Sequence, residues 1–304
     1  MTPSLVPSVT QRDDKGIHFM RIVGQAYDSA KLTEDEAQRV NDTPGLAKLL
    51  GDFIAGSRVT DRYINQQVNS TWTYPSEYTG PKGLEEQVKT LADCLPGLGE
   101  PNWSWYNDVY PKFDSPDWVE GVFAVPSEFA LQRIFNPEIT DRAAAYCASV
   151  NLLMGKIADS RPFYNYREGQ ITPAYLWRTE RTIEMLDALW ELQGQPDIIV
   201  LPAQLGKRHR GRSILRAREC FVGNEFGGGS LEGLAITLTH PERFVRWEQL
   251  HMDLPGDDFS SEADWQADRA PYLNFDDGEV RFYTLWAGNA NEYFGAVSCW
   301  LPPQ

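Results

Sequence analysis

The sequence predicts an α+β fold in which a helical N-terminal part precedes a mixed domain of helices and strands. Three observations support this class. Apolar residues recur at helical spacing in segments that begin near Thr140 and Pro173. The segment Asp197–Leu205 contains a continuous apolar run, which is typical of a buried strand. The segment Tyr272–Trp286 surrounds an Asp-Gly pair, which indicates a β-hairpin.

The N-terminal part is expected to comprise a mobile tail over residues 1–16 and a helical region over residues 17–110. Thr33 and Glu36 form a predicted capping box ahead of one short helix. A connector rich in proline and aromatic residues then leads into the mixed domain, which we place at residues 111–304.

The mixed domain is expected to contain a strand–helix–helix–strand crossover. Residues 121–125 (GVFAV) form the first strand and Asp197–Leu205 the second, with the two predicted helices between them. Such a connection permits the two strands to pair in parallel. A C-terminal antiparallel meander follows, formed by the hairpin and a last strand over residues 293–301.

Composition excludes several classes of protein. The net charge of −15 disfavours attraction to nucleic acid and to anionic membranes. The N-terminus lacks the pattern of a signal peptide, and no apolar run approaches the ~18 residues of a membrane span. The four cysteines lie far apart within apolar patterns, which predicts reduced, buried thiols in a cytoplasmic protein. The sequence indicates no oligomeric state.

The clearest chemical signal is the basic loop, residues 207–218, which follows the second strand. It carries six Lys and Arg residues in a strongly acidic chain. A strand end, a glycine-containing loop and a helix start suit an anion, because backbone N–H groups and guanidinium groups both donate to phosphate or carboxylate oxygens. The predicted ligand-binding residues are Lys207, Arg208, Arg210, Arg212 and Ser213.

A structural role is the alternative for this loop. The segment Asp253–Asp268 carries six acidic residues and is expected to be exposed. Its carboxylates could pair with the arginines of the basic loop, or both segments could be solvated. The spacing GKRHRGRS also differs from that of a nucleoside-triphosphate loop. The loop therefore indicates an anion without naming it.

Candidates for acid–base chemistry are Glu225, His251 and Asp253. Glu225 lies in the segment NEFGGGS, which is otherwise a flexible linker between two helices with a surface acid. His251 and Asp253 lie on a predicted strand. The histidine spacing matches no zinc signature, so no metal or cofactor is expected.

Several segments carry a resemblance when taken together. The segments LPAQLGKRHRGRS, NEFGGG, LTHPERF, DLPGDDF and NANEYFGAVSCWLP resemble a group of uncharacterised proteins from uncultured, small-genome candidate-phylum bacteria. The resemblance covers about residues 160–304. It implies that these segments belong to one unit, and it brings no assigned activity.

Three functions fit these observations. The first is a binding or interaction protein whose basic loop takes a phosphate-bearing ligand or an acidic protein partner. The second is an enzyme that acts on a phosphorylated or nucleotide-like small molecule. The third is a structural or assembly component without a site.

Overall fold

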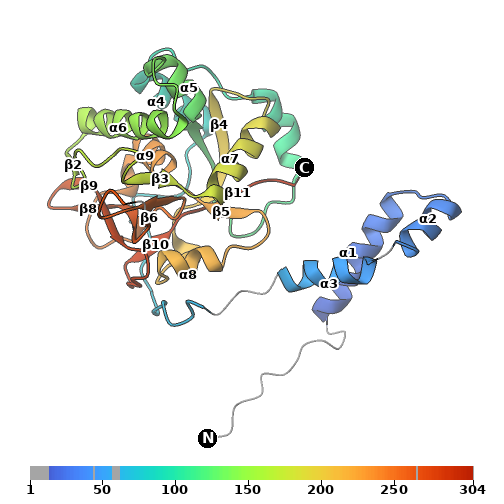
Figure 1. The fold of residues 1–304 in the computed structure, drawn as a ribbon. Helices are drawn as coiled ribbons and strands as arrows, with labels where there is room; N and C mark the ends of the chain where they lie inside the picture. Colours follow the sequence, from blue (N-terminus) through green and yellow to red (C-terminus); the bar gives the residue numbers. More distant parts are fainter. Residues whose placement is uncertain (1–13, 44, 57–61, 265, 304) are drawn as a thin grey trace, which may run out of the picture. The chain divides into compact units, whose positions relative to one another are not determined.

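The computed structural model describes residues 14–43, 45–56, 62–264 and 266–303. The chain divides into two compact units, Met1–Arg58 and Val59–Gln304 (Figure 1). The boundary expected near residue 110 is therefore corrected to residue 58. The physical reason is burial: the helix that precedes residue 110 packs into the core of the second unit.

The first unit consists of α1 (Asp14–Ser29), α2 (Glu34–Asn41) and α3 (Leu46–Gly56). The predicted capping box is present at α2, where the backbone N–H of Thr33 donates to the Glu36 carboxylate at 2.8 Å. Residues 1–13 of the expected tail lie outside the described residues. Residues 14–16 already belong to α1, so the helix begins earlier than the sequence indicated.

The second unit contains two β-sheets, drawn in Figure 1. The strands of the smaller sheet are all antiparallel, in the order β1-β4-β11-β5. The larger sheet runs β10-β6-β8-β7-β3, and β9 joins β8 to β2. The strand bounds are β1 (Gly121–Pro126), β2 (Phe163–Asn165), β3 (Leu176–Arg178), β4 (Ile198–Gln204), β5 (Glu225–Gly227), β6 (His251–Asp253), β7 (Asp257–Phe259), β8 (Arg269–Asp276), β9 (Glu279–Trp286), β10 (Phe294–Ala296) and β11 (Ser298–Trp300).

Helix α9 (Ser230–Thr239) lies at the centre of this unit. Every one of its residues is buried, and it contacts β1 of one sheet and β8 of the other. Its mainly apolar sequence suits such an enclosed position. The other helices are α4 (Leu84–Cys94), α5 (Glu128–Phe135), α6 (Arg142–Ser160), α7 (Glu180–Leu192), α8 (Ile214–Glu219) and the short turns η1 (Trp105–Val109), η2 (Tyr110–Lys112), η3 (Lys207–His209) and η4 (Pro241–Arg243).

The protein has the α+β class that the sequence predicts, but the crossover differs. Strands β1 and β4 are neighbours, and they pair antiparallel rather than parallel. Between them the chain enters the larger sheet twice, at β2 and β3, so it returns to the smaller sheet without making a simple crossover. The helix expected from Pro173 begins only at Glu180, after β3.

The hairpin is confirmed. β8 and β9 pair antiparallel over their full length, and Asp277 and Gly278 have positive φ angles of 51° and 84° at the turn. The expected last strand is divided in two: β10 pairs in parallel with β6, whereas β11 joins the smaller sheet. The C-terminal part is thus a meander only as far as β9.

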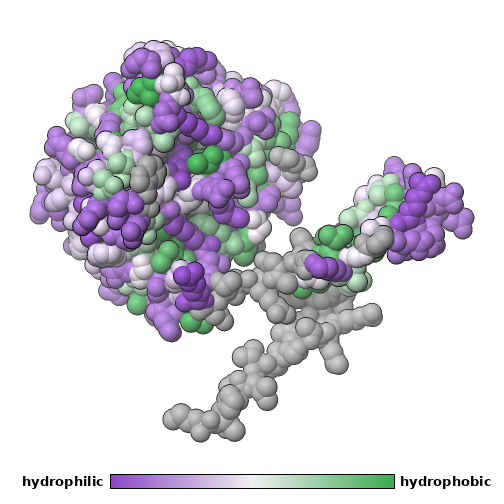
Figure 2. All heavy atoms as spheres, viewed as in Figure 1, coloured by the Kyte–Doolittle hydropathy of each residue, from purple (hydrophilic) through white to green (hydrophobic). Residues whose placement is uncertain are grey.

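Hydrophilic residues predominate on the face of the second unit that Figure 2 shows. None of the helices in the described ranges is both long enough and apolar enough to cross a lipid bilayer.

The glycines of the NEFGGGS segment permit close packing of two backbone segments. A Cβ on Gly227 would lie 2.6 Å from the backbone nitrogen of Gly256, and a Cβ on Gly256 would lie 2.6 Å from the Gly227 carbonyl oxygen. The expected flexible linker is therefore a buried junction between β5 and the turn that precedes β7.

We predict that Gly256→Ala destabilises the second unit by about 1–3 kcal/mol, because the added methyl group meets backbone that cannot move aside. Gly155→Ala is the matched control: Gly155 is an exposed residue of α6 with open space at its Cβ position. This control should stabilise the protein by roughly 0.5–1 kcal/mol. Denaturant unfolding measures both, and equal stability of the two variants would contradict the packing argument.

Candidate anion-binding site

The basic loop connects β4 to α8 and is fixed by backbone hydrogen bonds at Gly211. The N–H of Gly211 donates to the Phe294 carbonyl at 2.9 Å, and its carbonyl accepts from the N–H of Val68 at 2.7 Å. Gly211 has a φ of 73°, and a Cβ there would lie 2.2 Å from the carbonyl oxygen of Val68. Both observations require glycine, so the loop has a defined path.

Ser213 is the N-cap of α8. Its hydroxyl oxygen accepts from the N–H of Arg216 at 3.0 Å and donates to Gln66 Oε1 at 2.7 Å. Ser213 is fully buried, so these partners occupy the hydroxyl. Ser213, one of the predicted ligand-binding residues, therefore uses its hydroxyl group to position α8.

Glu225 is a fully buried carboxylate that accepts from several donors. Arg208 Nε lies 2.9 Å from it, His209 Nε2 2.7 Å and Ser298 Oγ 2.7 Å. Burial alone would raise the pKa of Glu225, but the hydrogen bonds from His209, Ser298 and Arg208 lower it to about 2. The carboxylate therefore stays ionised at neutral pH.

The protonation of His209 follows from its two neighbours. Arg212 Nη1 lies 2.7 Å from His209 Nδ1, and a guanidinium group can only donate. Nδ1 therefore accepts, and Nε2 carries the proton that is donated to Glu225. Burial lowers the pKa of His209, which agrees with this neutral form. A continuous chain of hydrogen bonds thus runs from Arg212 through His209 to Glu225.

Other cations of the loop are also engaged. Arg218 pairs with Asp258 at 2.7 Å and donates to the Pro255 carbonyl at 2.8 Å. Arg216 pairs with Glu219 at 2.7 Å. The Lys207 ammonium lies 4.4 Å from the centre of the Tyr74 ring. The expected pairing with Asp253–Asp268 is therefore present at Asp258, whereas Arg208 pairs with Glu225.

Arg210 and Arg212 differ from the other four cations of the loop. Both line an open hollow of about 440 Å³, together with residues 67–70. Arg210 is exposed and donates to the Trp72 carbonyl at 3.2 Å. Within the described part of the chain, neither guanidinium group forms an ion pair with a carboxylate. Arg210 and Arg212 are therefore the two predicted ligand-binding residues that line this hollow.

The remaining acid–base candidates lie in the larger sheet, apart from Glu225 in the smaller one. His251 is buried among aromatic rings, with its Nε2 3.3 Å from the Trp247 carbonyl. Burial lowers the pKa of His251 to about 4. Burial also raises the pKa of Asp253 well above its ordinary range. His251 is thus neutral at pH 7. Both residues lie on β6, the strand that the sequence predicted for them, but Asp253 is buried instead of exposed.

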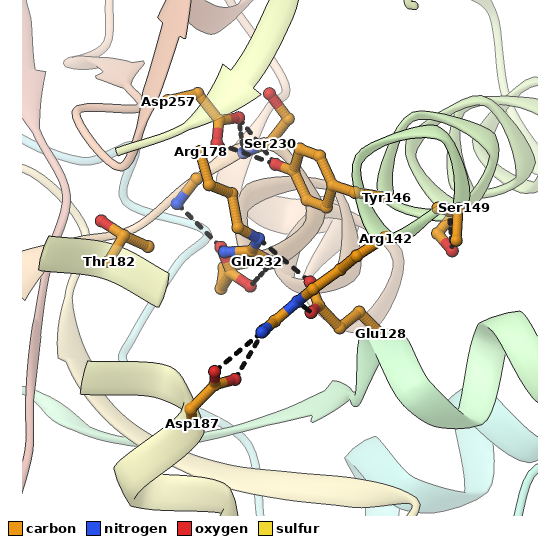
Figure 3. A network of polar contacts seen from close by, with 12 residues as sticks. Glu128, Arg142, Tyr146, Ser149, Arg178, Thr182, Asp187, Ser230, Glu232 and Asp257 are labelled. Carbon is orange, nitrogen blue, oxygen red and sulfur yellow. Dashed lines mark hydrogen bonds and ion pairs between the residues drawn. The ribbon is translucent and has the colours of Figure 1, made fainter. Parts of the chain in front are cut away.

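Figure 3 shows a second buried polar network, which the sequence did not indicate. Arg178 on β3 donates to both carboxylate oxygens of Glu232 on α9, at 2.7 and 3.0 Å. Tyr146 and the backbone N–H of Ser230 both donate to Asp257, at distances of 2.6–2.9 Å. Burial raises the pKa of Asp257 to about 6, against the charge of Arg178.

This network joins several elements. Arg178 also lies over the Tyr146 ring at 4.3 Å, and Arg142 bridges Glu128 and Asp187, as Figure 3 shows. The partners are separated by as many as 111 residues along the chain, as for Tyr146 and Asp257, so no local motif could indicate them. The one local signal is the capping position of Glu232, three residues after Gly229.

No protein-family model, curated protein or solved structure matches the chain. Among the residues that the structure describes, no group of three His, Cys, Asp or Glu residues is arranged to hold a metal ion.

We predict that Glu225→Gln lowers the unfolding free energy by about 3–5 kcal/mol, because it leaves Arg208 and its neighbours without a buried counter-charge. Glu168→Gln, which removes an exposed acid, should stay within about 0.5 kcal/mol of the wild type. Chemical denaturation compares them. A Glu225→Gln protein as stable as the control would show that the network contributes little.

A second prediction concerns the ionisation of His251. Because burial disfavours the charged ring, its titration midpoint should lie at about 4 instead of 6.5. Nitrogen-15 NMR of the imidazole rings should show the proton on Nε2 at pH 6. A midpoint at or above 6.5 for His251, or a proton on Nδ1, would contradict the assignment.

Proposed function

We propose that the protein binds a small phosphate-bearing ligand at the hollow lined by Arg210 and Arg212. The observation that supports this most is the difference within one loop. Four of its six cations contact carboxylates or an aromatic ring of the same chain, whereas these two line an open polar hollow. Guanidinium groups donate two parallel N–H groups to phosphate oxygens, which fits this position.

The position of Arg212 also favours binding. Its guanidinium group is held by His209, which is in turn fixed by Glu225. An arginine held in place before the ligand arrives loses less conformational freedom on binding than a mobile surface arginine. The amides of Gln67 and Asn69, which also line the hollow, supply further N–H donors to an anion.

Binding without turnover is the form of this function that the chemistry favours. Glu225 is the acid–base candidate that contacts the basic loop. Its carboxylate is ionised and already accepts hydrogen bonds from Arg208 and Ser298 of the same chain. The enzymatic alternative requires a group beside the ligand that gains or loses a proton near neutral pH, and the described residues that line the hollow include no carboxylate or imidazole. We also propose a reducing, cytoplasmic location, because the cysteines are free thiols.

Titration calorimetry with inorganic phosphate and pyrophosphate tests the proposal. The wild type should bind saturably, and Arg210→Gln and Arg212→Gln should each weaken binding about 10-fold or more, since a charge-assisted hydrogen bond contributes roughly 1.5–3 kcal/mol. Arg133→Gln is the control, because it removes one positive charge from an exposed arginine that pairs with Asp197.

Three results would contradict the proposal. They are no saturable binding of either anion by the wild type, equal weakening by Arg133→Gln, and selective binding of a glutamate-rich peptide in place of phosphate. The last result would favour an acidic protein partner. Affinity should also fall as salt is raised, since the contact is electrostatic.

A further inference from the structure

A second pocket lies on the larger sheet and is separate from the anion site. It has a volume of about 520 Å³ and is lined by residues of β6, β8, β9 and β10 together with Tyr166, Trp247 and the turn at Asn289–Asn291. We call it the aromatic pocket. No residue that lines the Arg210–Arg212 hollow lines this one.

Strand register explains how the aromatic pocket forms. Tyr272 pairs with Tyr283 across β8 and β9, and Asn274 pairs with Arg281. Side chains alternate along a strand, so these four lie on one face of the hairpin. Leu273 and its neighbours on the other face are buried in the hydrophobic core.

The walls of the pocket are aromatic rings with accessible surface. Trp247 is 39% exposed and Tyr166 45% exposed. Tyr166 lies 4.9 Å from Tyr283, measured between ring centres, and Tyr272 lies 4.9 Å from Phe294. These contacts hold the rings in place, so their remaining surface forms a rigid apolar platform.

Two buried polar atoms of the lining residues have no hydrogen-bond partner among the described residues: His251 Nδ1 and Asn274 Oδ1. Both residues are more than nine-tenths buried. The Nε2 of His251 faces the Trp247 carbonyl at 3.3 Å and so carries the ring proton, which makes Nδ1 an acceptor. Two acceptors in residues of the pocket wall are thus unsatisfied, and a ligand that donates hydrogen bonds would suit them.

The charge of the pocket argues against an anionic ligand. Arg281, its cation, pairs with Asp276 and is bound by Asp277 at 2.6 Å and Glu279 at 3.0 Å. Of these carboxylates only Asp276 lines the pocket, so its charge and that of Arg281 cancel there. An uncharged ligand therefore fits this environment better than a phosphate does.

The polar groups of the pocket come from several elements. His251 lies on β6, Asn274 on β8, and Asn289 and Asn291 on the turn before β10. A nucleobase presents its hydrogen-bonding groups along its edges and none on its faces, whereas a sugar ring presents hydroxyl groups around its whole circumference and C–H groups on its faces. C–H faces pack on aromatic rings, and hydroxyl groups donate to unpaired acceptors. We propose that the aromatic pocket binds a neutral saccharide.

Saturation-transfer NMR and calorimetry with maltose and cellobiose test this proposal, with adenosine as the competing ring ligand. The wild type should bind at least one of the two sugars saturably. Trp247→Ala, Tyr166→Ala and Asn274→Ala should each weaken that binding at least 10-fold. Asn274→Asp, which keeps an acceptor oxygen, should retain more affinity than Asn274→Ala.

Trp286→Ala is the matched control. Trp286 is 54% exposed at the end of β9 but does not line the pocket. This variant should bind as the wild type does, and circular dichroism verifies the fold of every variant. If Asn274→Ala does not fold, the exposed Trp247 and Tyr166 variants decide the question. The proposal is overturned if neither sugar binds, if only adenosine binds, or if Trp286→Ala loses affinity equally.

Discussion

The ion pair between Arg178 and Glu232 is the interaction on which the second unit most depends. Both side chains are almost fully buried, and two hydrogen bonds connect β3 to the first turn of the central helix α9. A lone charge at this depth would be strongly destabilising, so each partner requires the other. The same helix end is held by Asp257, which accepts from the N–H of Ser230 (Figure 3). The central helix is therefore positioned by polar contacts at its N-terminus and by apolar packing along its length.

Glu225 has the same role for the basic loop. It is buried two residues before the glycine-rich junction, and it directs Arg208 and His209 inward. The charge concentrated in this loop is largely balanced within the chain, which explains how so many cations fit beside a packed core. What remains for a ligand is the pair Arg210 and Arg212, whose positions depend on those buried contacts.

Trp72 connects the surroundings of the two proposed sites. Its carbonyl accepts from Arg210, and its ring lies 6.5 Å from that of His251 and 5.7 Å from that of Tyr293. The two sites have opposite chemistry. One offers guanidinium groups to an anion, and the other offers aromatic faces and unpaired acceptors to an uncharged ring. The proposed functions are accordingly independent, and each can fail without the other.

The sequence by itself determined the features that depend on neighbouring residues. Capping at Thr33 and the turn at Asp277-Gly278 are local patterns of a few residues, and the α+β class follows from the succession of helical and strand patterns along the chain. The tertiary structure alone decided the antiparallel pairing of β1 with β4 and the inward direction of Arg208. It also decided the partners of Arg178, which lie on α9, 54 residues away, and on α5. The physical reason is that burial of a charge depends on which distant carboxylate the fold brings within hydrogen-bonding distance, and local spacing carries no record of that distance.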